Sequence, residues 1–165
     1  MTERIVGKLG KLAPKRPEGL RMFADYQTNP LPTAPDKIDA PQVQDWRMLA
    51  NDQYGDCTFA GIVHARMATA AALGTSEAYP SDNEIVAAYL KYTNGQDQGA
   101  VEADLLKYWQ TNDIFGSKLA AFAPTDHSDF DELKSVIATF GLVYIGVQLP
   151  VTFQQQFQEN QPWDL

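Results

Sequence analysis

The feature that most constrains the fold is one long apolar segment, which runs from Cys57 to Leu73. Asp56 before it and Gly74 after it are residue types that favour the beginning and the end of a helix, so the sequence predicts a helix with Asp56 as its N-cap. Its apolar side chains do not form a single stripe, which indicates burial on more than one side. The larger of them are Phe59, Ile62, Val63, Met67 and Leu73. Other elements must therefore pack around this helix.

The beginning of the chain has a different character. Prolines interrupt any helical period there, and most of the charged side chains in the first 22 residues are basic. These prolines are Pro14, Pro17, Pro30, Pro32, Pro35 and the nearby Pro41. We expect residues 1–40 to form an extended, Pro-rich basic arm that lies on the domain or on a partner. Residues 41–165 then form the domain.

Capping residues and apolar spacing predict the other elements of the domain. The expected helices run from Ser81 to about Tyr92, from Glu102 to Asn112, from a cap at Ser128 to Phe140, and from Phe153 to Phe157. β-Branched and aromatic residues favour strands over Lys118–Ala123 and Leu142–Leu149. A lone strand cannot satisfy its own edges, so these two either pair with each other or with strands outside this chain. The fold class we expect is therefore α+β.

Composition excludes several classes of function. The chain carries 13 basic and 21 acidic side chains, and its net charge of −8 repels phosphate backbones, so we expect no nucleic-acid partner. No apolar run approaches the ~18–20 residues that span a bilayer, and the N-terminus does not resemble a signal peptide. A single cysteine permits no internal disulfide and fits a reducing compartment. We expect a cytoplasmic protein with no membrane partner.

The chemical signal lies around Cys57. A thiol at the first turn of a helix is stabilised as a thiolate by the helix dipole and the unpaired N–H groups. The Cys57 N–H and an amide side chain from the preceding loop, Asn51 or Gln53, are candidates to hold an oxyanion. Gly55 lets that loop turn tightly. The pattern predicts a nucleophilic Cys57, with a small buried cysteine as the alternative.

The same residues resemble the papain-like cysteine peptidases. Asp45-Trp46-Arg47 is followed by Gly55-Asp56-Cys57-Thr58-Phe59-Ala60, and Asn51 stands six positions before the cysteine, where the family has its oxyanion Gln. The segment more specifically resembles divergent phage- and prophage-associated members, in which Asn-Asp-x-x-Gly-Asp-Cys-Thr precedes a His on the same helix. The resemblance covers about residues 41–150, with the Cys57 segment as its specific part. It implies a papain-like helical lobe with a central Cys-bearing helix, plus the first strand or strands of a β-rich lobe whose end this chain lacks.

The family takes its catalytic histidine from that second lobe, and this chain has only His64 and His127. His64 follows Cys57 by seven residues, so both share a helix face, but their backbones are ~10 Å apart along the axis. His64 is therefore a poor general base for Cys57 and is expected to bond to a carbonyl. His127 lies in a polar loop and is expected to be solvated. Neither has metal-ligand partners at useful spacing, and thiol acyl transfer requires no cofactor.

Two functions follow from the sequence. The first is a papain-like thiol hydrolase, a cysteine peptidase acting on a peptide or protein substrate, with Cys57 as nucleophile and the catalytic His missing from this chain. The second is a non-catalytic papain-fold module that binds other protein chains through the arm, for example as a structural component of a phage virion or assembly. A truncated chain would also explain the missing His.

Overall fold

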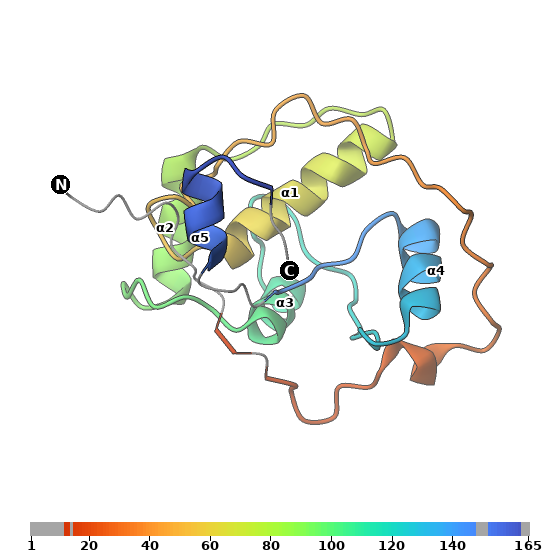
Figure 1. The fold of residues 1–165 in the computed structure, drawn as a ribbon. Helices are drawn as coiled ribbons and strands as arrows, with labels where there is room; N and C mark the ends of the chain where they lie inside the picture. Colours follow the sequence, from red (N-terminus) through yellow and green to blue (C-terminus); the bar gives the residue numbers. More distant parts are fainter. Residues whose placement is uncertain (1–11, 14, 148–151, 163–165) are drawn as a thin grey trace.

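The structure is a computed structural model, and it describes residues 12–13, 15–147 and 152–162. Its elements follow one another along the chain in the order of Figure 1. They are the 3-10 helix η1 (Phe23–Tyr26) and the α-helices α1 (Cys57–Ala72), α2 (Asp82–Tyr92), α3 (Glu102–Thr111), α4 (Phe130–Phe140) and α5 (Thr152–Gln158). The predicted helices are thus present.

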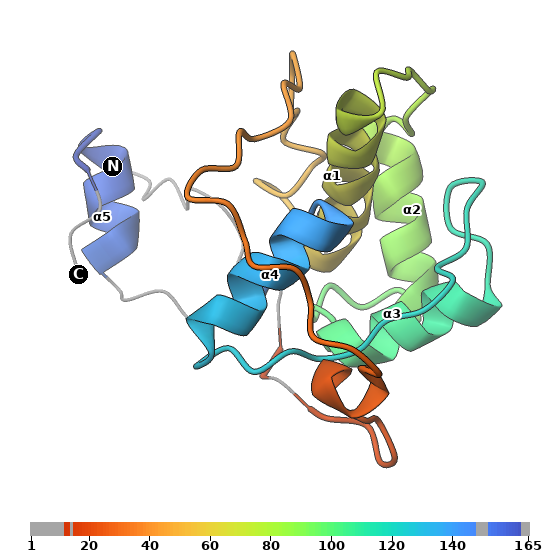
Figure 2. The ribbon, with the colours of Figure 1, turned by 90° about the vertical axis from the view of Figure 1, so that its right-hand side faces the viewer.

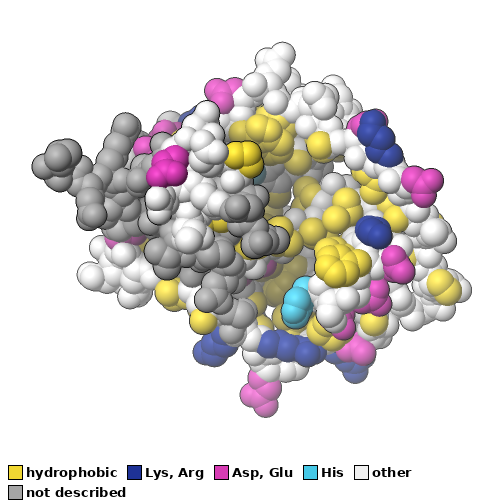
Figure 3. Space-filling view, viewed as in Figure 1, with side chains coloured by type: hydrophobic (Ala, Val, Ile, Leu, Met, Phe, Trp, Pro, Cys, Tyr) yellow, Lys and Arg dark blue, Asp and Glu magenta, His cyan; other side chains and the backbone are white. Residues whose placement is uncertain are grey.

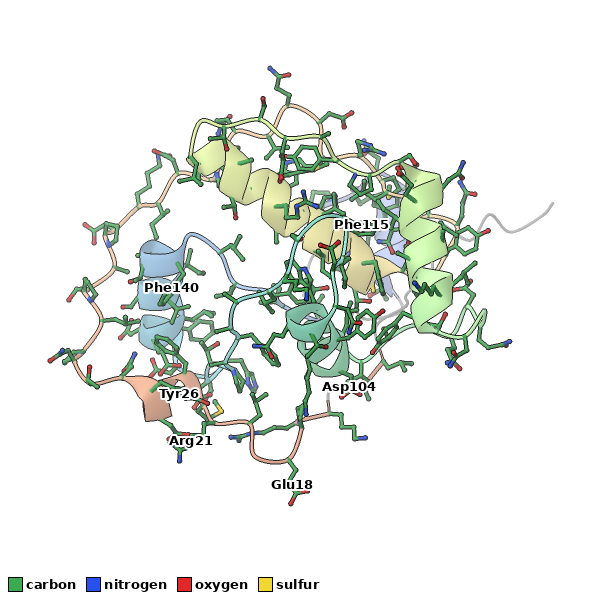
Figure 4. All side chains as sticks on the ribbon, turned by 180° about the vertical axis from the view of Figure 1, so that it is seen from behind. Glu18, Arg21, Tyr26, Asp104, Phe115 and Phe140 are labelled. Atoms are coloured by element: carbon green, nitrogen blue, oxygen red, sulfur yellow. The ribbon has the colours of Figure 1, made fainter. Side chains whose placement is uncertain are left out.

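Helix α1 forms the centre of the core, as its apolar sequence predicts. It runs beside α2, and α3 crosses below both (Figure 2). Phe59 of α1 is 1 % exposed, and its ring meets those of Tyr89, Tyr92 and Phe115 edge-on at 5.9, 5.7 and 6.5 Å. Phe115 lies against α1 in Figure 4. The remaining core residues are Leu49, Ala60, Ile62, Val63, Met67, Ile85, Leu105, Trp109 and Ile114. Burial on several sides makes the start of α1 a well-supported platform.

Local signals set the ends of most helices. Ser81 begins α2 through a capping box, in which the Ser81 N–H donates to Glu84 Oε2 at 2.7 Å and Ser81 Oγ accepts from the Glu84 N–H. Gly141 ends α4 in the left-handed conformation (φ 85°), which a residue with a Cβ rarely adopts. One expected cap differs. Asp129, not Ser128, is the N-cap of α4, because its carboxylate accepts from the N–H groups of Asp131 and Glu132.

The expected α+β class is wrong for the part of the chain that the structure describes. There the structure is helical with no sheet, and its only bridge is an isolated antiparallel pair, Ile114 with Ser117. The predicted strand 118–123 contacts α3 instead of a neighbouring strand. Its Leu119 N–H donates to the Trp109 carbonyl at 3.3 Å. Residues 142–147 then have no strand to pair with, and positions 148 and 149 of that predicted strand lie outside the described residues.

The described part of the arm lies on its own domain. It follows the rim of the molecule from η1 past α4 and over α1 (Figure 1). The Leu12 N–H donates to the Ala100 carbonyl at 3.1 Å, and the Phe23 N–H donates to the Pro124 carbonyl at 2.8 Å. The Phe23 ring meets that of Phe140 at 5.7 Å, where η1 faces α4 (Figure 4). These contacts hold residues before and after the core together.

No helix in the described segments combines the length and the apolar character that a membrane-spanning helix needs.

Candidate functional site

Cys57 is the first residue of α1 and is half-buried, outside any disulfide. Asp56 occupies the N-cap position, but its side chain makes no capping hydrogen bond. The Phe59 and Ala60 N–H groups donate to the Asp56 carbonyl at 2.7 and 3.0 Å, so no carboxylate caps the first turn. The dipole of α1 favours a thiolate at this end of the helix. This placement is the one that the sequence predicts for a nucleophile.

The loop before α1 is held in an unusual backbone conformation. Arg47, Leu49 and Ala50 have positive φ angles of 53°, 58° and 64°, which side chains with a Cβ seldom adopt. Packing holds the loop, since Leu49 is fully buried. The Arg47 guanidinium donates to Asp82 at 2.7 Å, and His64 Nε2 donates to the Trp46 carbonyl at 2.7 Å. These contacts fix the loop that carries the candidate amides.

The structure separates the two amide candidates. Asn51 is half-buried, and its Oδ1 has no hydrogen-bond partner among the described residues. The Gln53 residue is exposed, and its backbone N–H donates to the Ala50 carbonyl at 2.9 Å. An oxyanion needs a donor, which in Asn51 is the Nδ2 amide group and not the unpaired Oδ1. Asn51 is the better candidate of the two because it is half-buried, whereas Gln53 is exposed.

Asp56 is a site residue that sequence reasoning treated only as a cap. Its side chain is fully buried, and neither carboxyl oxygen has a hydrogen-bond partner within the described segments. Burial raises the pKa of Asp56 from its ordinary 3.8 to about 7, and the charges of Asp97, Asp52 and Asp82 act in the same direction. Near neutral pH this carboxyl therefore changes charge directly beside the thiol-bearing residue.

Asp97 ties a second loop to the start of α1. Its Oδ1 accepts from the Gly55 N–H at 2.9 Å and from the Tyr89 hydroxyl at 2.8 Å. The Gly99 N–H donates to the same hydroxyl at 2.8 Å. Burial, and next the hydrogen bond and charge of Asp97, raise the pKa of Tyr89 to about 12. An acidic residue between two glycines, in Gly95–Gly99, is the sequence signal that points to this loop.

Tyr144 is a further site residue that the sequence placed in a strand. Its hydroxyl donates to the Thr58 carbonyl at 2.6 Å, across 86 positions of sequence. Burial raises the pKa of Tyr144, and the charges of Glu102 and Cys57 act in the same direction, so both groups lie near its hydroxyl. The structure therefore brings the segment after α4 onto the first turn of α1.

The histidines are not placed as a general base for Cys57. His64 lies on the uninterrupted helix α1, ~10 Å along the axis from Cys57, and its Nε2 donates to the carbonyl of Trp46. His127 lies in an exposed loop before α4. Among the described residues no group of three or more His, Cys, Asp or Glu is arranged to hold a metal ion.

The arrangement supplies a half-exposed thiol at a helix N-terminus, one enclosed amide and a carboxyl with a pKa of about 7. Such a set can form and stabilise a covalent adduct on sulfur. In comparisons with known proteins, the chain matches no protein-family model, no curated protein and no solved structure.

Proposed function

We propose that the protein is a thiol hydrolase of the cysteine peptidase type, with Cys57 as its nucleophile. The observation that carries this proposal is the half-exposed Cys57 thiol at the first residue of α1, where the Asp56 side chain leaves the helix N-terminus uncapped. The half-buried Asn51, whose Nδ2 group can donate to an oxyanion, supports it from the preceding loop. The resemblance of the Cys57 segment to papain-like peptidases points to the same chemistry.

In the proposed reaction the Cys57 thiolate attacks the carbonyl carbon of a peptide bond and forms a C–S bond. The Cys57 N–H and the Asn51 amide stabilise the oxyanion. The C–N bond then breaks, and the leaving amine takes the proton that the thiol gave up. Water hydrolyses the thioester and regenerates the thiol. A histidine from another chain, or from residues beyond this sequence, carries the proton between these steps.

The ionisation of Cys57 tests the proposal. An ordinary thiol has a pKa of ~8.5, and we expect the pH profile of Cys57 alkylation by iodoacetamide to have its midpoint about one unit lower. The reason is the uncapped N-terminus of α1. Mass spectrometry of the intact chain measures the rate, with Cys57→Ser as the unreactive control. A midpoint at or above that of a free thiol contradicts the proposal.

Asn51 gives a second prediction. A peptide aldehyde adds to a thiol and creates an oxyanion, whereas iodoacetamide does not. We therefore expect Asn51→Ala to weaken protection of Cys57 by a peptide aldehyde about tenfold, in keeping with the loss of one oxyanion donor. The iodoacetamide rate itself stays unchanged. Gln53→Ala is the matched control, because Gln53 is an exposed amide of the same loop. Equal effects of the two substitutions would argue against the role of Asn51.

The second candidate is a non-catalytic module that binds other protein chains. Exposed apolar side chains favour it: Phe130 and Phe140 of α4 are 67 % and 60 % exposed, and Ile145 and Val147 are 67 % and 61 % exposed. Hydrophobic side chains also surround the hollow at the centre of the face in Figure 3. Size-exclusion chromatography with light scattering tests this function. A monomer at every concentration, with an alkylation midpoint well below that of a free thiol, would favour the hydrolase instead.

A further inference from the structure

One aromatic side chain covers the helix face that carries Cys57. The Tyr144 hydroxyl bonds to the Thr58 carbonyl, and its ring lies over Gly61. Residues 57 and 61 are four apart on α1, so they lie on the same helix face, one turn apart. Tyr144 therefore lies over the helix face that Cys57 shares, one turn along α1 from the cysteine.

Gly61 makes this contact possible. A Cβ built at position 61 would lie 2.7 Å from the Tyr144 hydroxyl oxygen and 2.8 and 2.9 Å from two ring carbons. These distances are shorter than any van der Waals contact, so every other residue at position 61 would displace the phenol. A glycine inside a helix destabilises it relative to alanine, and here that residue provides the space that the ring occupies.

Among the described residues, side chains rather than backbone bonds hold the segment that carries Tyr144. Within the part of the chain that the structure describes, no backbone group of residues 142–147 forms a backbone–backbone hydrogen bond. Ile145 and Val147 are largely exposed, whereas Leu142, Val143 and Tyr144 are half-buried. Side-chain contacts, with the Tyr144 hydroxyl bond among them, therefore hold the segment in place. Segments with so few backbone bonds open more easily than the helices beside them.

We propose that Tyr144 is a plug, which rests on Gly61, restricts access to Cys57 and leaves when the segment 142–147 lifts from α1. This inference builds on the proposed function, since it regulates the same thiol. It assigns residues 142–147 the role of a strap rather than a strand of a sheet. The space under the ring accepts a phenol-sized apolar group with a hydrogen-bond donor at its tip, because Tyr144 itself satisfies that description.

The test compares two thiol reagents of different size, iodoacetamide and fluorescein maleimide, on the full chain. Both react with the thiolate, so the ratio of their rates reports access and not the pKa of Cys57. We expect Tyr144→Ala to raise the rate of the bulky reagent about tenfold and that of iodoacetamide much less. Ile145→Ala is the control, because this exposed side chain lies on the same strap. Its rates should equal those of the unmodified protein.

Gly61→Ala provides an independent variant that keeps the helix. Alanine is a better helix former than glycine, so α1 is retained while the new Cβ expels the ring. We expect the same rise in the rate ratio as for Tyr144→Ala, and no further rise in the double variant, because both changes remove one contact. Circular dichroism checks that the helices remain. Unchanged ratios in both single variants would overturn the plug.

A small phenol can occupy the space over Gly61 that the Tyr144 ring leaves, and its effect distinguishes the two variants. We expect p-cresol to slow the bulky reagent in Tyr144→Ala, where the space over Gly61 is empty, and to have no effect in Gly61→Ala, where the Cβ occupies it. Equal effects in the two variants would contradict the assignment of the space to Gly61. If the plug is wrong, the rate ratio does not change in the variants, while the alkylation midpoint of Cys57 still lies below that of a free thiol. If the proposed function is wrong, that midpoint lies at or above that of a free thiol, and the rate ratio can still change.

Discussion

At pH 8 the Asp56→Asn variant is expected to be more stable than the unmodified protein by about 2–4 kcal/mol in the free energy of unfolding. Asp56 is fully buried without a hydrogen-bond partner in the described segments, so its charged form is disfavoured by the fold. Its pKa is about 7 in the folded chain against 3.8 ordinarily, and each unit corresponds to about 1.4 kcal/mol. The asparagine side chain is itself a buried amide without a partner at this position. The gain in the free energy of unfolding is therefore smaller than the whole pKa shift would give.

The pH dependence of this stability difference shows whether the charge of Asp56 causes it. Between about pH 4 and pH 7 the folded chain still holds the Asp56 proton that the unfolded chain has released, so stability falls as the pH rises and levels off above 7. The advantage of Asp56→Asn should therefore shrink to less than about 1 kcal/mol at pH 4, where the folded carboxyl is neutral and the unfolded one is close to half-protonated. Urea denaturation of both proteins at pH 4 and pH 8 measures this. The exposed Asp36→Asn, which is not among the charges that act on Asp56, serves as the control. An equal gain of Asp56→Asn at both pH values would contradict the explanation.

The second large effect is expected from Phe59→Ala, which should lower the free energy of unfolding by about 3–5 kcal/mol. Phe59 is 1 % exposed and its ring contacts three other aromatic rings, so truncation leaves a cavity at the point where α1, α2 and the residues after α3 meet. Thermal or urea denaturation followed by circular dichroism gives the value.

The matched control for Phe59 is Phe130→Ala at the start of α4. The Phe130 side chain is 67 % exposed, so its removal should change the free energy of unfolding by less than about 0.5 kcal/mol. Similar losses for the two variants would mean that the core is not centred on α1.

The helices could be predicted because their signals are local. The Ser81–Glu84 capping box and the left-handed Gly141 act within one helical turn, and both mark the ends that the structure has. The strands could not be predicted, because β-branched residues favour extended backbone without supplying a partner. Residues 118–123 bond to α3, and no sequence pattern near them indicates this choice.

In the candidate site, too, features set by neighbouring residues could be predicted, and contacts between distant residues could not. Cys57 at the start of a helix was visible in the sequence, since the neighbouring residues favour a turn followed by a helix. Asp56 is the N-cap of that helix, as predicted, but its carboxyl is buried and does not accept a hydrogen bond from the first turn. The contacts of Asp97 with Gly55 and of Tyr144 with Thr58 span 42 and 86 positions, and such distant pairs leave no periodic pattern in a single sequence.

The arm has a consequence for the order in which the chain acquires its structure. Leu12 bonds to Ala100, Phe23 bonds to Pro124, and the Phe23 ring rests on Phe140, so each anchor of the arm comes much later in the sequence than the arm itself. During synthesis, residues 12–23 leave the ribosome long before their anchors exist. The core around α1 can assemble first, and the N-terminal residues close over it only after α4 has been made.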